Sequence, residues 1–178
     1  MIDRIMRVIK LDFPVFKEIE SDPNATTEAA IIVVVTTLLS AFGSALWSGR
    51  FFSEFIREVF NGIVGWVAVA GVAYFVAKSL FNGKGTLEGM LRVLGYANAP
   101  RLLGILGIIP CVGWIGVLAG WILFLIMGFM AIREGMDLDA GQAIIVIVVG
   151  LIALVVVNVI FLLIFGIPAG LIRAIQGY

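Results

Sequence analysis

The sequence predicts an all-α fold, a polytopic bundle of five transmembrane helices preceded by a short amphipathic helix. Of its 178 residues, 62% are hydrophobic and only 13% are charged, whereas soluble domains are about half apolar and about a quarter charged. A soluble chain of this length could not bury so much apolar surface, because a small fold leaves a large share of its atoms exposed. The second indication is a series of apolar stretches of the roughly 20 residues that cross the hydrocarbon core.

Residues 1–25 are predicted to form a cytoplasmic amphipathic segment ahead of the membrane domain of residues 26–178. Pro14 is expected to divide this segment into two helices. Its basic residues Arg4, Arg7 and Lys10 lie off an apolar stripe. The first helix therefore either lies in the headgroup layer or packs on the protein's own cytoplasmic face, and both interpretations stay open. The stripe has helical spacing and consists of Ile2, Ile5, Met6, Ile9, Phe13 and Phe16.

The first two predicted spans are regular apolar stretches. The first covers residues 27–47 and is followed by an aromatic cluster of the kind that favours the membrane interface. The second covers residues 59–77 and is rich in glycine and alanine, which allow helices to approach closely in lipid.

The region of residues 89–130 admits two interpretations. In one, a third span (90–109) and a fourth span (114–132) flank a turn at residues 110–113. In the other, residues 102–130 form one kinked helix, about 43 Å long at 1.5 Å per residue, which exceeds the roughly 30 Å hydrocarbon core. Pro110 would also interrupt such a helix. We favour two spans.

The last predicted span covers residues 143–167, with Asp139 as its N-cap. Cytoplasmic loops are enriched in lysine and arginine, and five spans with the N-terminus inside place nine such residues inside and three outside. A four-span arrangement gives the same tally, so charge supports an inside N-terminus without fixing the number of spans. The nine are Arg4, Arg7, Lys10, Lys17, Lys78, Lys84, Arg92, Arg101 and Arg133, and the three are Arg50, Arg57 and Arg173.

Polar residues in apolar helices are costly and mark candidate sites. The candidate polar patch is formed by Tyr96, Asn98, Pro100, Arg101 and Asn158. It would hold a ligand, a lipid headgroup or a partner. The structural alternative is a helix start at the interface, with Arg101 reaching phosphates and Asn158 bonding a neighbouring helix.

Two GxxxG pairs are candidate helix-packing positions, within the bundle or in a homodimer. They are Gly116 with Gly120, and Gly166 with Gly170.

Chemistry-bearing patterns are missing from the sequence. There is no histidine, which removes the commonest general base and metal ligand. The sequence contains no HExxH, P-loop or GxGxxG pattern. Twelve basic and twelve acidic residues give no surplus of positive charge for nucleic acid. We therefore expect no enzyme, no metal and no cofactor.

Three segments resemble the Yip family of membrane proteins, which is named for interaction with Ypt/Rab GTPases. They are GKGTLEGMLRVLGYANAP (83–100), the hairpin IPCVGWIGVLAGWILFLIMGF (109–129) and AIREGMDLDAGQAI (131–144). The resemblance implies five spans, an inside N-terminus and an outside C-terminus. It also implies partners in vesicle traffic and membrane shaping. The chain has no counterpart of the family's Asp-Leu-Tyr-Gly-Pro segment, which argues against Rab binding, and it is similar to the short prokaryotic members.

From these observations we expect a non-enzymatic protein of a prokaryotic cell membrane that organises or scaffolds membrane or protein partners. Its expected partners are the lipid bilayer, a second copy of the chain or another membrane protein. The alternative is a conduit for small solutes or ions, or a lipid-moving protein, lined by four residues of the patch: Tyr96, Asn98, Arg101 and Asn158. That alternative requires the patch to converge on one cavity.

Overall fold

The structure is a computed structural model that describes residues 1–47, 51–108 and 113–161. Within these residues every regular element is a helix, so the predicted all-α fold is confirmed. The elements are α1 (Ile2–Ile9), α2 (Val15–Ser21), α3 (Ala25–Trp47), α4 (Phe51–Phe81), α5 (Leu87–Ala97), the 3₁₀ helix η1 (Ala99–Ile108), α6 (Gly113–Gly135) and α7 (Ala140–Phe161).

Three helices in the described part are long and apolar enough to cross a membrane. Their candidate spans are Ala25–Phe42 in α3, Phe55–Phe81 in α4 and Ile115–Gly135 in α6. They correspond to the first, second and fourth predicted spans. In α7 a shorter apolar stretch, Ala140–Ile152, is described, and the end of the predicted last span lies outside the described residues.

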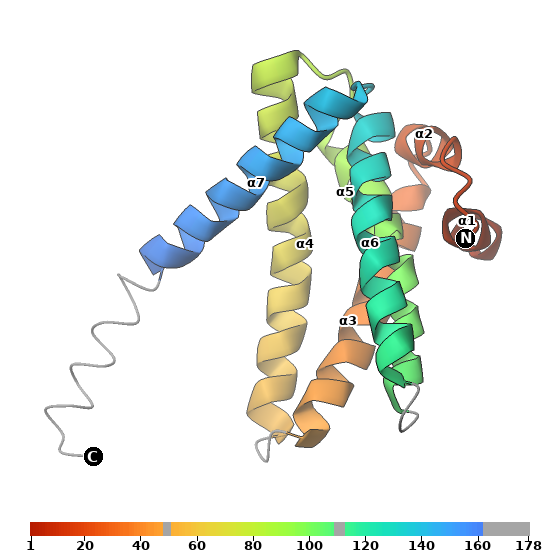
Figure 1. Cartoon of the computed structure of the whole chain (residues 1–178), viewed down its shortest axis with the longest axis vertical. Coiled ribbons are helices and arrows are strands. Elements are labelled where there is room, and N and C mark those ends of the chain that lie inside the picture. Colours follow the sequence, from red (N-terminus) through yellow and green to blue (C-terminus); the bar gives the residue numbers. More distant parts are fainter. Residues whose placement is uncertain (48–50, 109–112, 162–178) are drawn as a thin grey trace, which may run out of the picture.

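The predicted third span is not one continuous α-helix. α5 ends at Ala97 and η1 continues the chain in the tighter 3₁₀ form. Pro100 accounts for the break, because it lacks an N–H, its ring would clash with the preceding turn, and it disfavours the α conformation of the residue before it. The chain then reverses, since η1 and α6 pack along each other (Figure 1). The single long helix of residues 102–130 is therefore wrong.

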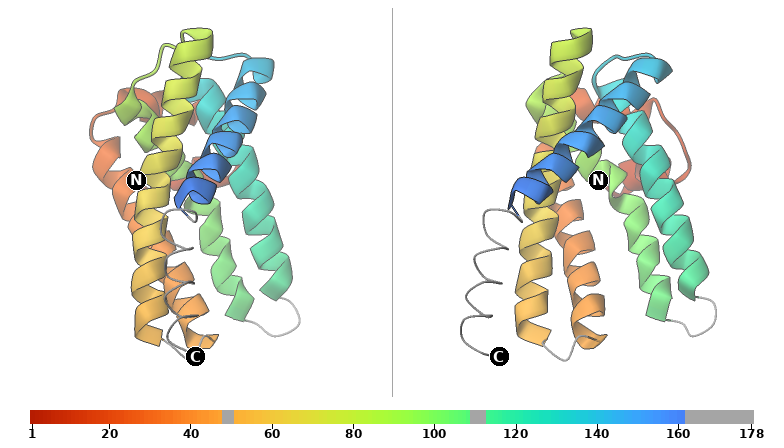
Figure 2. Two further views of the ribbon diagram at one scale, coloured as in Figure 1. Left: turned by 90° about the vertical axis from the view of Figure 1, so that its left-hand side faces the viewer. Right: turned by 60° about the vertical axis from the view of Figure 1, so that its left-hand side comes forward.

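The helices α3, α4 and α6 run along the long axis of the molecule, and α5 and η1 descend beside α3 and α6 (Figure 1). α7 slants away from the axis and packs on α4 and α6 (Figure 2). α1 and α2 lie on the outside of the bundle near one end. The loops 82–86 and 136–139 close the same end, which we call the N-terminal end.

The helices α3 and α5 approach each other closely. A Cβ on Gly95 of α5 would lie 2.6 Å from the Cβ of Ala29 on α3, so only glycine fits there. Between α4 and α5, the indole N–H of Trp66 donates to the Leu91 carbonyl at 3.1 Å. The core therefore combines small residues at close helix contacts with larger buried side chains such as Phe16 and Met127 and a few specific hydrogen bonds.

Large apolar side chains are exposed along the spans. On α4, Phe60 is 65% and Phe75 is 69% exposed, and on α7, Leu151 and Ile152 are each 58% exposed. An exposed apolar surface of this extent marks contact with lipid or other protein. Apolar helices of spanning length with such faces indicate an integral membrane protein.

Candidate functional site

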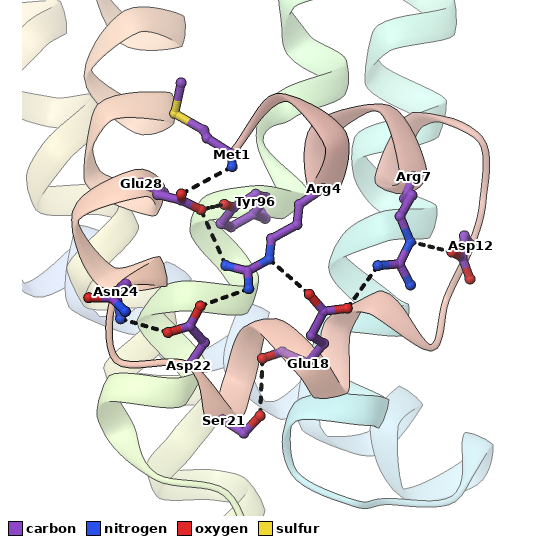
Figure 3. Close-up of polar contacts among 10 residues, drawn as sticks. All are labelled: Met1, Arg4, Arg7, Asp12, Glu18, Ser21, Asp22, Asn24, Glu28 and Tyr96. Atoms are coloured by element: carbon purple, nitrogen blue, oxygen red, sulfur yellow. Dashed lines mark hydrogen bonds and ion pairs between the residues drawn. The ribbon is translucent and has the colours of Figure 1, made fainter.

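Charged residues gather at the N-terminal end, where α1 and α2 meet α3 and α5 (Figure 3). We call them the N-terminal ion cluster. Three cationic groups and four carboxylates make it up, which leaves one net negative charge. Its members are the Met1 ammonium, Arg4, Arg7, Asp12, Glu18, Asp22 and Glu28.

Arg4 is the centre of this cluster, because its guanidinium contacts carboxylates from two other helices and the turn that joins them. The Nε atom lies 3.1 Å from Glu18 of α2, and the two Nη atoms lie 2.7 Å from Asp22 and 3.4 Å from Glu28. Arg7 adds contacts to Asp12 at 2.6 Å and to Glu18 at 2.8 Å. These contacts hold α1 against α2 and the first turn of α3.

The charges in the cluster shift each other's titration. Arg7, followed by Arg4, lowers the pKa of the Glu18 carboxyl below its ordinary value. Arg4 likewise lowers the pKa of the Asp22 carboxyl, and the Asn24 backbone N–H adds to the effect at 2.9 Å. Both carboxyls are therefore held in the ionised form at neutral pH.

Tyr96 joins the cluster from α5. Its side chain is fully buried and its hydroxyl donates to the Glu28 carboxylate. Glu28 also lies 3.1 Å from the Met1 ammonium. Figure 3 shows Met1, Arg4 and Tyr96 converging on Glu28. Because Gly95 lets α5 approach α3 closely, the phenol reaches a carboxylate in the first turn of α3.

Arg92 is a second polar junction, one turn before Tyr96 on α5. Its guanidinium donates to the Thr26 hydroxyl at 2.6 Å, the Glu20 carbonyl at 2.8 Å and the Glu88 carboxylate at 3.1 Å. The side chain is only 8% exposed, whereas that of Glu88 is 77% exposed. Arg92 therefore ties α5 to the end of α2 and the start of α3.

The two loops of the N-terminal end are tied to each other and to α2. The Lys84 ammonium lies 2.8 Å from Asp137, and Lys17 lies 3.3 Å from the same carboxylate. Lys84, with a smaller effect from Lys17, lowers the pKa of Asp137.

The predicted cap on α7 is confirmed: the Gln142 N–H donates to Asp139 at 2.8 Å, and the Asp139 N–H donates back to Gln142 at 3.1 Å.

The other residues of the predicted polar patch bond locally. The Asn98 amide donates to the Leu94 carbonyl at 2.8 Å and accepts from Arg101 at 3.3 Å. The Arg101 guanidinium also lies 5.4 Å from the ring centre of Phe124 on α6, a cation–π contact. Pro100 is buried in η1. Asn98 and Arg101 therefore form one group, whereas Tyr96 bonds to the ion cluster.

Several predicted positions are only partly described. Asn158 is in α7, but its side chain lies outside the described residues, as do Gly166 and Gly170. Gly120 is buried and Gly116 is half-buried on α6. Among the described residues no group of three or more His, Cys, Asp or Glu side chains is placed to hold a metal ion.

Sequence reasoning did not identify Glu28 or the inward orientation of Arg4. Both residues look like ordinary interface charges, and nothing in the sequence pairs two residues that lie 24 positions apart. The one available signal was a carboxylate in the first turn of an apolar span. Such a group requires a partner when it faces protein.

In the comparison with protein families, residues 11–169 match the Yip1 domain. No curated protein matches the chain. No solved structure matches it either.

Proposed function

The chain belongs to the Yip1 domain family, and from this premise we propose that it is a non-enzymatic integral membrane protein that organises membrane or protein partners through its helix surfaces. The observation that carries the proposal is a contrast in side-chain partners. The buried polar groups Tyr96, Arg92 and Asn98 all bond within the chain, whereas large apolar side chains on the spans are exposed. Association along apolar helix faces is the use that this surface favours.

The charge distribution supports an N-terminal end that faces the cytoplasm. Eight of the twelve lysine and arginine residues belong to this end, which agrees with the excess of positive residues in cytoplasmic loops. Five spans remain part of the proposal, with α5 and η1 as an interrupted third span and α7 as the fifth. The eight residues are Arg4, Arg7, Lys10, Lys17, Lys78, Lys84, Arg92 and Arg133.

The α4 surface offers a place for a second helix to approach closely. A Cβ added at Gly65 or Gly71 meets no atom within 4 Å. Small residues with open space beside them are the positions at which membrane helices associate. We therefore favour self-association over a conduit for solutes or lipids, for which the described patch residues would have to line one common space.

Native mass spectrometry of the whole protein released from mild detergent tests this function. We expect a defined dimer or higher oligomer, or a retained partner chain. A monomer that holds one lipid or small molecule would contradict the scaffold and favour the conduit. Gly65→Leu should weaken the oligomer if α4 forms the interface, and Val67→Leu is the matched control because Val67 is already large and is 49% exposed.

A further inference from the structure

The first helix, α1, buries Val8 and packs Ile5 against the core, but its arginines face the protein while two of its other apolar residues are exposed. Its two arginines bond to carboxylates of the protein. Its apolar residues Ile2 and Met6 are 73% and 47% exposed. A helix on a protein surface in water normally turns its apolar stripe inward and its charges outward.

The ion cluster fixes the level of α1 along the bundle. Both Arg4 and the Met1 ammonium contact Glu28 in the first turn of α3. The candidate span in α3 begins at Ala25. A span begins where hydrocarbon gives way to the polar headgroup region, so α1 lies at that boundary.

The direction of α1 also suits the membrane surface. Figure 1 shows α1 almost end-on, while α3, α4 and α6 run lengthwise, so α1 lies across the bundle axis. In the same view α1 is nearer the middle of the molecule than α2. A helix across the axis at the level where a span begins lies parallel to the membrane plane.

The apolar side of α1 is turned toward the hydrocarbon. Arg4 and Arg7 extend from α1 toward α2, at the end of the bundle (Figure 3). At 100° per residue, Ile2 and Met6 each lie about 160° around the helix from Arg4. The two apolar side chains therefore point away from α2, along the long axis of the molecule, toward the level of the middle of the spans.

The lipid-facing surface of α3 continues from this level. Ile31, less than one turn after Glu28, is 45% exposed, and Val35, one turn later, is 42% exposed. The exposed side chains of α1 thus extend an apolar surface that belongs to a candidate span. A lipid monolayer would cover both surfaces together.

We propose that α1 lies in the headgroup layer of the membrane, with Ile2 and Met6 in contact with lipid acyl chains while Arg4 and Arg7 hold the helix to the ion cluster. The proposal rests on the proposed function in that the chain must be an integral membrane protein. The sequence alone allowed the first helix either to lie in the headgroup layer or to pack on the protein's own cytoplasmic face. The proposal places the exposed apolar side of α1 in the headgroup layer.

Site-directed fluorescence in lipid nanodiscs tests the proposal. The whole protein carries Cys111→Ser and one new cysteine labelled with a polarity-sensitive dye. Ile2→Cys and Met6→Cys report the apolar side of α1. Asp3→Cys is the matched control, because Asp3 is exposed on the same helix. Labels at positions 2 and 6 should be blue-shifted and quenched by brominated lipid, whereas the label at position 3 should be quenched by iodide in water.

Ile31→Cys separates failure of this proposal from failure of the proposed function. If the label at position 31 is not quenched by brominated lipid, the chain does not span the membrane as proposed. If position 31 is quenched by lipid but positions 2 and 6 are quenched by iodide, α1 is solvated and this inference alone is overturned. Protection of positions 2 and 6 from both quenchers would place protein on α1, and would also overturn it.

Discussion

The N-terminal end and the spans of this protein differ in what their side chains contact. At the N-terminal end, Arg4, Arg92 and Tyr96 each bond to named groups on other elements. Along α4 and α7, the outward side chains are apolar and exposed. The first region is specified by particular pairs of residues, whereas the second is specified by hydropathy and by a few small residues.

This difference has an energetic reason. Between membrane helices there is no hydrophobic driving force, because lipid is as apolar as leucine, and close packing and hydrogen bonds decide which helices associate. The specific contacts therefore carry most of the information about helix arrangement. Changes at the N-terminal end should be costly, and changes on the open faces of the spans should be tolerated.

Replacement of Arg92 should have the largest effect. Arg92→Met leaves the half-buried Glu20 and Thr26 without the charged donor to their carbonyl and hydroxyl groups, which we expect to lower the free energy of unfolding by about 2–4 kcal/mol. Unfolding of the protein in mixed micelles, followed by circular dichroism, measures the change. The stability of Arg92→Lys should lie between those of the wild type and Arg92→Met, because a lysine ammonium keeps the charge but lacks the planar fork of donors. If Arg92→Met were as stable as the wild type, the N-terminal end would not depend on its specific contacts more than the spans do.

The glycine pair Gly95 and Gly128 tests the contrast by packing alone. Gly95→Ala forces a methyl group against Ala29, and we expect a loss of about 1–3 kcal/mol. Gly128→Ala is the matched control on α6, where the added Cβ meets no atom within 4 Å. It should be neutral or slightly stabilising because alanine favours helix. Equal effects at the two sites, measured by the same unfolding experiment, would contradict the close approach of α3 and α5.

The sequence predicted the helical class, three of the spans and the cap on α7, because these depend on local signals. Apolar stretches of spanning length identified α3, α4 and α6, and Asp139 stands three residues before Gln142 in the pattern of a reciprocal cap. Each of these features is encoded within a few residues.

The remainder depends on contacts between segments far apart in the chain. The hydrogen bond from Tyr96 to Glu28 spans 68 residues, and that from Arg92 to the Glu20 carbonyl spans 72. Hydropathy identified the polar residues of α5 but not their partners. It also did not predict that Tyr96 and Asn98, two residues apart, would bond to different groups. Pro100 was expected near a helix start, but the 3₁₀ form of η1 was not predicted.

Removal of one hydroxyl should have a moderate effect. Tyr96→Phe keeps the buried ring but leaves Glu28 with only Arg4 and the Met1 ammonium, which we expect to lower the free energy of unfolding by about 1 kcal/mol. Tyr74→Phe on α4, where the tyrosine is half-buried, is the control on a span and should change less. The same micelle unfolding measures both variants. A larger loss from Tyr74→Phe would reverse the comparison.

Acid should have the smallest effect and should act on the N-terminal end alone. Because Arg7 and Arg4 lower the pKa of Glu18, and Arg4 lowers that of Asp22, the unfolded chain binds more protons than the native one below the ordinary carboxyl range of about 4. The stabilisation of α1 and α2 is therefore complete above that range and is lost as pH falls through the lowered values. A spin label at Asp3→Cys should become more mobile below about pH 4, whereas one at Leu151→Cys, which is exposed on α7 far from the Asp139 cap, should not change. High salt at neutral pH should weaken the same contacts, since exposed ion pairs are screened. Equal mobilisation of both labels by acid would mean that the two regions are not held by different forces.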